Sequence, residues 1–174
     1  MQLSTTARRF VLHWGAMGSK WGVNRTVAQI HALLYVSREA LNAEQIAGAL
    51  GVARSNVSTS LRELQGWRLV RTVPVLGDRR EHYETLGDVW EMFEIVLDER
   101  KRRELDPTLE LLRSCVREGE ADREDEHTQA RLEQMLEFFE ATTSWYDELR
   151  RLSPRALRRL MRLGRKVRQL VDSM

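Results

Sequence analysis

Two short helical segments joined by the turn "LGVAR" constrain the fold of this chain more than any other feature of its sequence. Asn42 is followed three residues later by Gln45, a spacing close to the capping box that begins many helices. The apolar pattern that follows stops at Gly51, the residue type expected at the C′ position of a helix. A second apolar helical pattern begins within a few residues. Helix, short turn and helix together predict a helix-turn-helix motif.

The second helix of this motif lies within "GVARSNVSTSLREL" and carries many hydroxyl side chains, which are indifferent helix formers. Its apolar residues Val57, Leu61 and Leu64 recur at helical spacing and are expected to dock on the preceding helices. Hydroxyls and arginines occupy the remaining surface, where they suit base edges and phosphates of a DNA major groove. The predicted DNA-contacting residues are Arg54, Ser55, Asn56, Ser58, Thr59 and Arg62. Taken alone, the helix also fits an ordinary polar surface helix.

The next segment, "WRLVRTVPVLGDRREHYETL", changes its apolar period from helical to alternating, which predicts two strands and a turn. Gly77 and Asp78 fall in the turn, and Pro74 fits an edge strand because it cannot donate to a ladder. A hairpin with Arg79 and Arg80 near its tip, directly after a helix-turn-helix, predicts the wing of a winged-helix domain. We expect these arginines to follow the DNA backbone or enter the minor groove, with Asp78 paired to one of them.

Helical patterns flank this unit on both sides. Residues 4 to 20 carry an apolar stripe that we expect to break near Gly15 and Gly18, and Asn24 is the predicted N-cap of the next helix. Downstream, Asp106 and Pro107 are expected to start a new helix as N-cap and N1. Ser153 and Pro154 are expected to open a last helix, whose apolar positions continue to Val167 and Leu170.

These patterns predict a mainly α chain with a small β-wing: a winged helix-turn-helix domain plus long C-terminal dimerisation helices. We divide it into an N-terminal helix at 1–22, placed at the dimer interface, a winged domain at 23–86 and a helical region at 87–174. That region is predicted to dimerise and is a candidate for effector binding. The charged residues of segment 118–148 are mostly acidic, and those of segment 150–168 are all basic. This asymmetry favours helices that pair with each other or with another chain. Packing within one chain and binding to a different protein are the alternatives to a homodimer.

Composition excludes several other functions. A formal net charge of +2 points only weakly to polyanionic partners, and the single cysteine, Cys115, precludes an internal disulfide. Cys115 has apolar neighbours and is expected to be an inert thiol. We find no signal peptide or membrane-spanning run and expect a cytoplasmic protein. The four histidines are scattered, and no phosphate-binding loop or nucleophile motif occurs. We therefore expect no enzyme, no metal and no cofactor.

The order of elements resembles the MarR-type winged-helix transcriptional regulators, in particular their GbsR-like branch. The resemblance spans roughly residues 10–113 and rests on "MGSKWGVNRTVAQIHALLYVS", "LNAEQIAGALGVARSNVSTSLRELQGWRLVRTVPVLGDRREHYET" and "DVWEMFEIVLDERKRRELDPTLELL". It implies a homodimeric repressor that binds a pseudo-palindromic operator in double-stranded DNA. It places the DNA contacts on the helix residues named above and on Arg79 and Arg80 of the wing.

The resemblance also suggests a small-molecule effector, with quaternary ammonium compounds such as choline as the candidate class. Such a cation needs a cage of aromatic ring faces, and the five tryptophans are Trp14, Trp21, Trp67, Trp90 and Trp145. Aromatic residues at helical spacing also serve simply as core, so a dimer without an effector stays open. The rival function is a winged helix for protein–protein assembly that does not read DNA sequence. That rival predicts an apolar or acidic recognition face.

Overall fold

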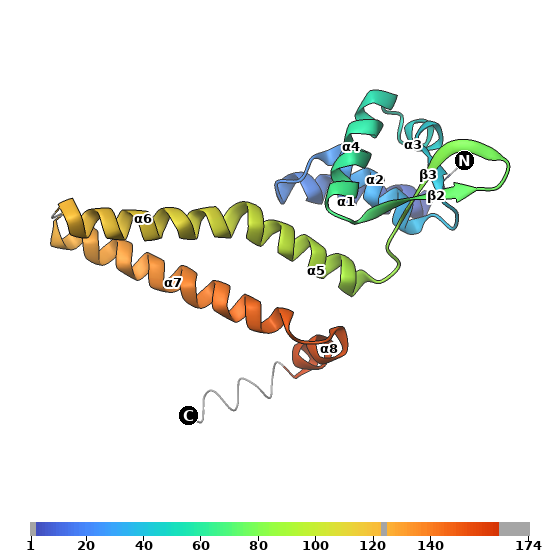
Figure 1. Ribbon diagram of the computed structural model, residues 1–174. Helices are drawn as coiled ribbons and strands as arrows, with labels where there is room; N and C mark the ends of the chain where they lie inside the picture. The colour runs from blue at the N-terminus through green and yellow to red at the C-terminus, as the bar shows by residue number, and fades with distance from the viewer. Residues whose placement is uncertain (1–2, 123–124, 164–174) are drawn as a thin grey trace. The chain divides into compact units, whose positions relative to one another are not determined.

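The computed structural model describes residues 3–122 and 125–163 and divides the chain into two compact units, Met1–Ile95 and Val96–Met174 (Figure 1). The sequence-based boundaries at 22/23 and 86/87 stay a prediction. Positions 167 and 170, expected in the last helix, lie outside the described residues.

The first unit is a mainly helical domain with a three-stranded antiparallel sheet, as predicted for a winged helix-turn-helix. Its elements are α1 (Thr5–Lys20), α2 (Arg25–Val36), β1 (Leu41–Asn42), α3 (Ala43–Leu50), α4 (Arg54–Gly66), β2 (Val70–Val75) and β3 (Asp78–Thr85). Helix α5 (Val89–Arg100) follows and begins in this unit.

Helix α2 lies at the centre of this unit and contacts α1, α3, α4 and β3. Ile30 and Leu33 of α2, Ile46 of α3 and Leu61 of α4 are at most 1% exposed. Fully burying one such side chain stabilises a fold by roughly 1.5–3 kcal/mol. The apolar face of α4 is therefore fixed against the helices before it, and its polar face is turned outward.

The caps expected from sequence begin and end these helices. The Asn24 side chain accepts hydrogen bonds from the backbone N–H groups of Thr26 and Val27. Asn42 and Gln45 form the complete capping box at the start of α3. Gly51 ends that helix with φ 67°, a left-handed conformation that glycine adopts without a steric penalty.

The expected break of the first helix is wrong, because α1 runs without interruption through Gly15 and Gly18. Both glycines are buried where α1 crosses α2. A Cβ atom built at Gly15 would lie 2.4 Å from Gln29 Cγ, and one at Gly18 would lie 2.5 Å from Ala28 Cβ. The two glycines therefore permit close packing of helices and do not act as helix breakers.

The sheet has the strand order β1-β3-β2, so the predicted hairpin forms its main part and Pro74 lies in an edge strand as expected. The register pairs Val73 with His82 and Val75 with Asp78, with an irregularity between these two pairs. Gly77 turns the chain with φ 83°. The third strand, β1, was not expected from sequence, because its two residues are too few to show a period.

The second unit contains the end of α5, the π-helical turn η1 (Lys101–Leu105), α6 (Asp106–Asp122), α7 (Glu126–Arg150) and α8 (Pro154–Arg162). Helix α6 starts at Asp106, close to the expected position, but the expected N-cap is wrong, because Asp106 is itself helical and its N–H donates to the carbonyl of Lys101. Proline lacks a backbone donor and crowds the preceding turn of an α-helix. The wider π turn accommodates Pro107, so the chain stays helical from residue 96 to residue 122.

Helices α6 and α7 pack as a hairpin. Leu109 and Val116 of α6 and Thr143 of α7 are buried between them. Arg113 of α6 donates to Glu140 of α7 at 2.9 and 3.0 Å. At its other end α7 is held by Asp98, which accepts hydrogen bonds from the Tyr146 hydroxyl and Arg150. Ser153 caps α8, as predicted.

Candidate nucleic-acid interface

The outward face of α4 carries every residue predicted to contact DNA from this helix. Val57, Leu61 and Leu64 are 0–1% exposed, which confirms the predicted core face. The residues Arg54, Ser55, Asn56, Ser58, Thr59 and Arg62 are all exposed. Ser60 is buried and belongs to the packed side of the helix.

Apart from the ion pair of Arg54 with Glu44 of α3, the contacts of this outward face are local and weak. The Ser58 hydroxyl donates to the carbonyl of Arg54 at 3.1 Å. Arg62 reaches the carbonyl of Ser58 and the hydroxyl of Thr59, both at 3.4 Å, the long end of the hydrogen-bond range. At the N-terminus of α4, Ala53 supplies no side-chain cap and the first turn has no acidic residue. The face thus presents hydrogen-bond donors and acceptors. Among the described residues, the guanidinium of Arg62 has only these two long hydrogen bonds.

The two wing arginines differ in their surroundings. The side chain of Arg79 is exposed and, within the described part of the chain, forms no hydrogen bond or ion pair. Arg80 donates from Nε to both oxygens of Asp78 at 2.9 and 3.1 Å and from Nη2 to Asp78 Oδ2 at 2.5 Å. The predicted pairing of Asp78 with a wing arginine is therefore confirmed, and the partner is Arg80.

These charge-assisted hydrogen bonds act on both partners. The guanidinium of Arg80 holds the pKa of the Asp78 carboxyl well below its usual range. The hydrogen bonds that Arg80 donates to Asp78 and, to a lesser extent, to Glu44 raise the pKa of Arg80. His82 lies buried beneath this pair. Its Nδ1 is 2.9 Å from the carbonyl oxygen of Arg80, and its Nε2 is 3.5 Å from Asp78 Oδ2.

Glu44 is a further residue of this surface, which the sequence analysis did not identify. Its carboxylate accepts from Arg54 at 3.1 Å and from Arg80 at 2.8 Å, and so connects α3 with α4 and the wing. In the sequence, Glu44 looks only like a favourable acidic residue in the first turn of a helix. Its pairing with Arg80 spans 36 residues, and no local pattern signals it.

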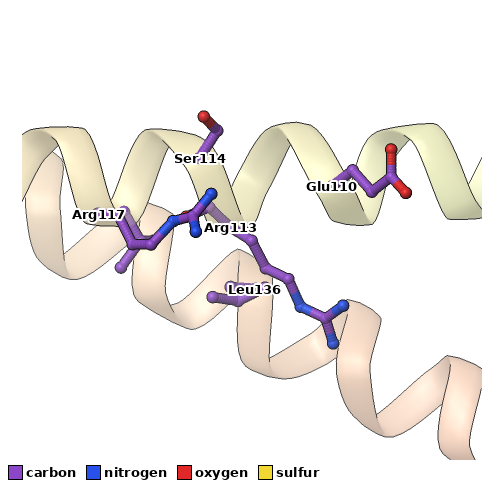
Figure 2. A pocket seen from close by; sticks show the side chains of 6 residues that line it. Glu110, Arg113, Ser114, Arg117 and Leu136 are labelled. Carbon is purple, nitrogen blue, oxygen red and sulfur yellow. The ribbon is translucent and has the colours of Figure 1, made fainter.

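Two open hollows lie on the α6–α7 hairpin. One, of about 470 Å³, lies beside Arg113, Arg117 and Leu136, and Figure 2 shows Arg113 extending from α6 toward α7. The other, of about 690 Å³, extends past Lys101 to Arg151. Neither lining includes an aromatic ring, so neither supplies the cage predicted for a quaternary ammonium effector.

Aromatic rings do converge in the first unit. The ring centroids of Phe10 and Trp14 are 5.5 Å apart, and those of Trp14 and Trp21 are 5.9 Å apart with their planes at 89°. Trp21 is 49% exposed. The three rings thus form one aromatic cluster in which Trp14 and Trp21 pack edge to face.

Other chemical groups are sparse. Among the described residues there is no cluster of three or more histidine, cysteine, aspartate or glutamate side chains that could hold a metal ion. Cys115 is a free, half-buried thiol. The helices of the described segments are all too short or too polar to cross a membrane.

The helix-turn-helix, the third strand and the wing together define a winged helix-turn-helix domain. Residues 21–81, which include this motif and most of the wing, match the model of the MarR family. A solved structure described as a transcriptional regulator shares the fold at 21% identity, covering 82% of this chain and 94% of that chain with a TM-score of 0.63. A MepR mutant of S. aureus bound to an oligodeoxyribonucleotide matches at 15% identity over 79% of this chain and 90% of that chain. The TM-score of that match is 0.38. No curated protein matches the chain. The fold and the family match support a DNA-binding transcriptional regulator.

Proposed function

We propose that this protein is a homodimeric repressor of the MarR type that binds a pseudo-palindromic DNA operator and carries out no catalytic step. The proposal rests chiefly on α4, whose buried and exposed faces separate the apolar residues from the predicted DNA contacts. A hairpin with exposed Arg79 follows this helix in the order required of a wing. In a two-fold symmetric dimer, two such helices would enter successive major grooves about 10 base pairs apart.

The dimer is supported by large apolar side chains left exposed on α7. Met135 is 49% exposed, Phe138 62% and Trp145 66%, and their spacing places them on one face of the helix. Soluble monomers seldom expose such a stripe, and contiguous apolar surface usually marks a site of association. A second copy of the same stripe is the simplest partner, because a two-fold interface is self-complementary.

Within this proposal, the chain is assigned to the GbsR-like branch, with a quaternary ammonium effector. The branch rests on the sequence resemblance, and the effector on the rings of Phe10, Trp14 and Trp21. Titration with choline, followed by tryptophan fluorescence, tests the effector. A saturable change that is lost in Trp21→Ala and kept in Trp145→Ala supports this site, and a flat titration of the wild type removes the effector from the proposal.

The decisive experiment is selection of genomic DNA fragments by the purified full-length protein at two salt concentrations. Enrichment of a two-fold symmetric motif supports the dimeric DNA reader. Binding that lacks a motif and vanishes uniformly with salt contradicts sequence-specific recognition, since phosphate contacts alone behave in this way. The protein-assembly rival predicts an apolar or acidic α4 face, whereas the exposed predicted contacts of α4 are polar or basic.

A further inference from the structure

Glu44, in the first turn of α3, receives guanidinium groups from both elements of the candidate DNA-binding surface. Its Oε1 accepts from Nη1 of Arg54, the first residue of α4, at 3.1 Å. Its Oε2 accepts from Nη1 of Arg80 in the wing at 2.8 Å. Two arginines predicted to contact DNA thus converge on a single carboxylate.

The two carboxylates near Arg80 have different positions. Asp78 accepts from Nε and Nη2 of Arg80, and its side chain is 24% exposed. Glu44 accepts only from Nη1, and its side chain is 49% exposed. Asp78 therefore fixes the direction of the guanidinium, while Glu44 occupies the one donor nitrogen that remains.

The contacts of Glu44 are of a kind that another anion can replace. The side chains of Arg54 and Arg80 are 67% and 52% exposed, so solvent screens both ion pairs. Exposed ion pairs contribute little to folding stability. A phosphate matches the guanidinium fork at least as well as a carboxylate does, and DNA supplies phosphates in a dense array.

We propose that the Glu44 carboxylate competes with DNA phosphate for Arg54 and Arg80. When DNA binds, the two arginines exchange this carboxylate for phosphate oxygens. This inference rests on the proposed DNA-binding function. In the free protein the carboxylate neutralises part of the basic surface and lowers its affinity for any DNA. Because phosphate contacts carry no sequence information, Glu44 lowers the affinity for operator and random DNA by the same factor.

The test compares Glu44→Gln with wild type in binding to a random-sequence duplex and to the duplex enriched by selection, at about 50 and about 200 mM salt. If each exposed ion pair weakens DNA binding about threefold, loss of both pairs should tighten binding to each duplex about tenfold at the lower salt. The slope of log K against log salt should steepen by up to about 0.9, because the surface gains one net positive charge. Thermal unfolding of both proteins shows whether the variant remains folded.

Glu91→Gln is the matched control, because it removes the same charge from an exposed position at the start of α5. It should leave the affinity and the salt slope close to wild type. Unchanged or weaker DNA binding by a folded Glu44→Gln protein would overturn the inference and make Glu44 a structural link between α3 and the wing. A gain confined to one duplex would overturn it as well. If wild type binds neither duplex, it is the proposed function that fails.

Discussion

Arg62 is the arginine of α4 that no described carboxylate neutralises. Its neighbours are a backbone carbonyl and a hydroxyl, both at 3.4 Å, so its guanidinium is available to an external acceptor. An arginine that reads a guanine edge contributes about 1–3 kcal/mol of discrimination. We expect Arg62→Ala to lose about that much operator affinity and to relax the preference at one position of each half-site, measured by binding to a set of single-substitution duplexes.

Arg79→Ala is the comparison variant, because Arg79 lies in the wing and is expected to contact phosphate or the minor groove. It should weaken binding to all duplexes alike and make the salt slope shallower by about 1. If Arg62→Ala instead behaves like Arg79→Ala, Arg62 contacts only the backbone and leaves the set of base-reading residues.

His31 of α2 gives a prediction about pH. Its Nε2 is buried without a hydrogen-bond partner among the described atoms, and burial lowers the pKa of the ring to about 4. The unfolded chain has a histidine pKa near 6.5 and so binds the proton more readily than the folded chain. The stability from the neutral ring is thus complete above about pH 6.5 and is lost as the pH falls toward 4.

We therefore expect the unfolding free energy of His31→Leu to fall less steeply than that of wild type between about pH 6.5 and pH 4. Urea denaturation at several pH values measures both slopes. Parallel curves for the two proteins would mean that His31 is protonated as readily in the folded chain as in the unfolded one.

At the scale of elements, features set by neighbouring residues could be predicted from sequence. The caps at Asn24, Asn42 and Ser153 involve bonds within three residues, so the local pattern contains all the necessary information. The errors arose at glycine and proline, whose usual roles were overridden. Gly15 serves the close approach of Gln29 from another helix, and the helical chain continues through Pro107 after a π turn.

The end of α4 shows the same limit. Gly66 is the last residue of the helix, but the left-handed residue is Arg68, with φ 60°. The N–H of Leu69 donates to the carbonyl of Leu64 at 3.0 Å, and the Leu69 side chain is 1% exposed. Leu69 is thus buried while the preceding residue, Arg68, holds a left-handed conformation. This conformation costs a non-glycine residue about 1–2 kcal/mol.

Arg68→Gly should relieve this cost and stabilise the first unit by about 1 kcal/mol, after the entropy of the more flexible unfolded chain is subtracted. Chemical denaturation measures the change. Arg68→Ala is the control, since it removes the charge and retains the strained backbone, and it should give no gain. Equal stabilisation by both variants would assign the effect to charge.

At the scale of the whole molecule, the candidate site is only partly visible in the sequence. The outward face of α4 follows from one helical period, and the wing follows from its alternating pattern and its place after α4. Glu44 could not be predicted, because its partners Arg54 and Arg80 lie on two other elements. Dimerisation by the helical region is predicted from sequence, whereas the apolar residues of α7 that remain exposed are identified only by the structure.

The proposed homodimer makes the α7 stripe a testable surface. Phe138 and Trp145 are exposed, whereas the packed side of α7 buries Thr143 against α6. We expect the double variant Phe138→Glu and Trp145→Glu to remain helical and to dissociate to monomers, because charges placed at a self-complementary interface oppose each other. Sedimentation velocity measures the mass, and circular dichroism measures the helix content. Leu76→Glu, at a fully exposed position in the turn of the wing, is the control and should keep the wild-type mass. A double variant that sediments as a dimer would exclude this stripe as the interface, and the operator symmetry would then depend on another surface.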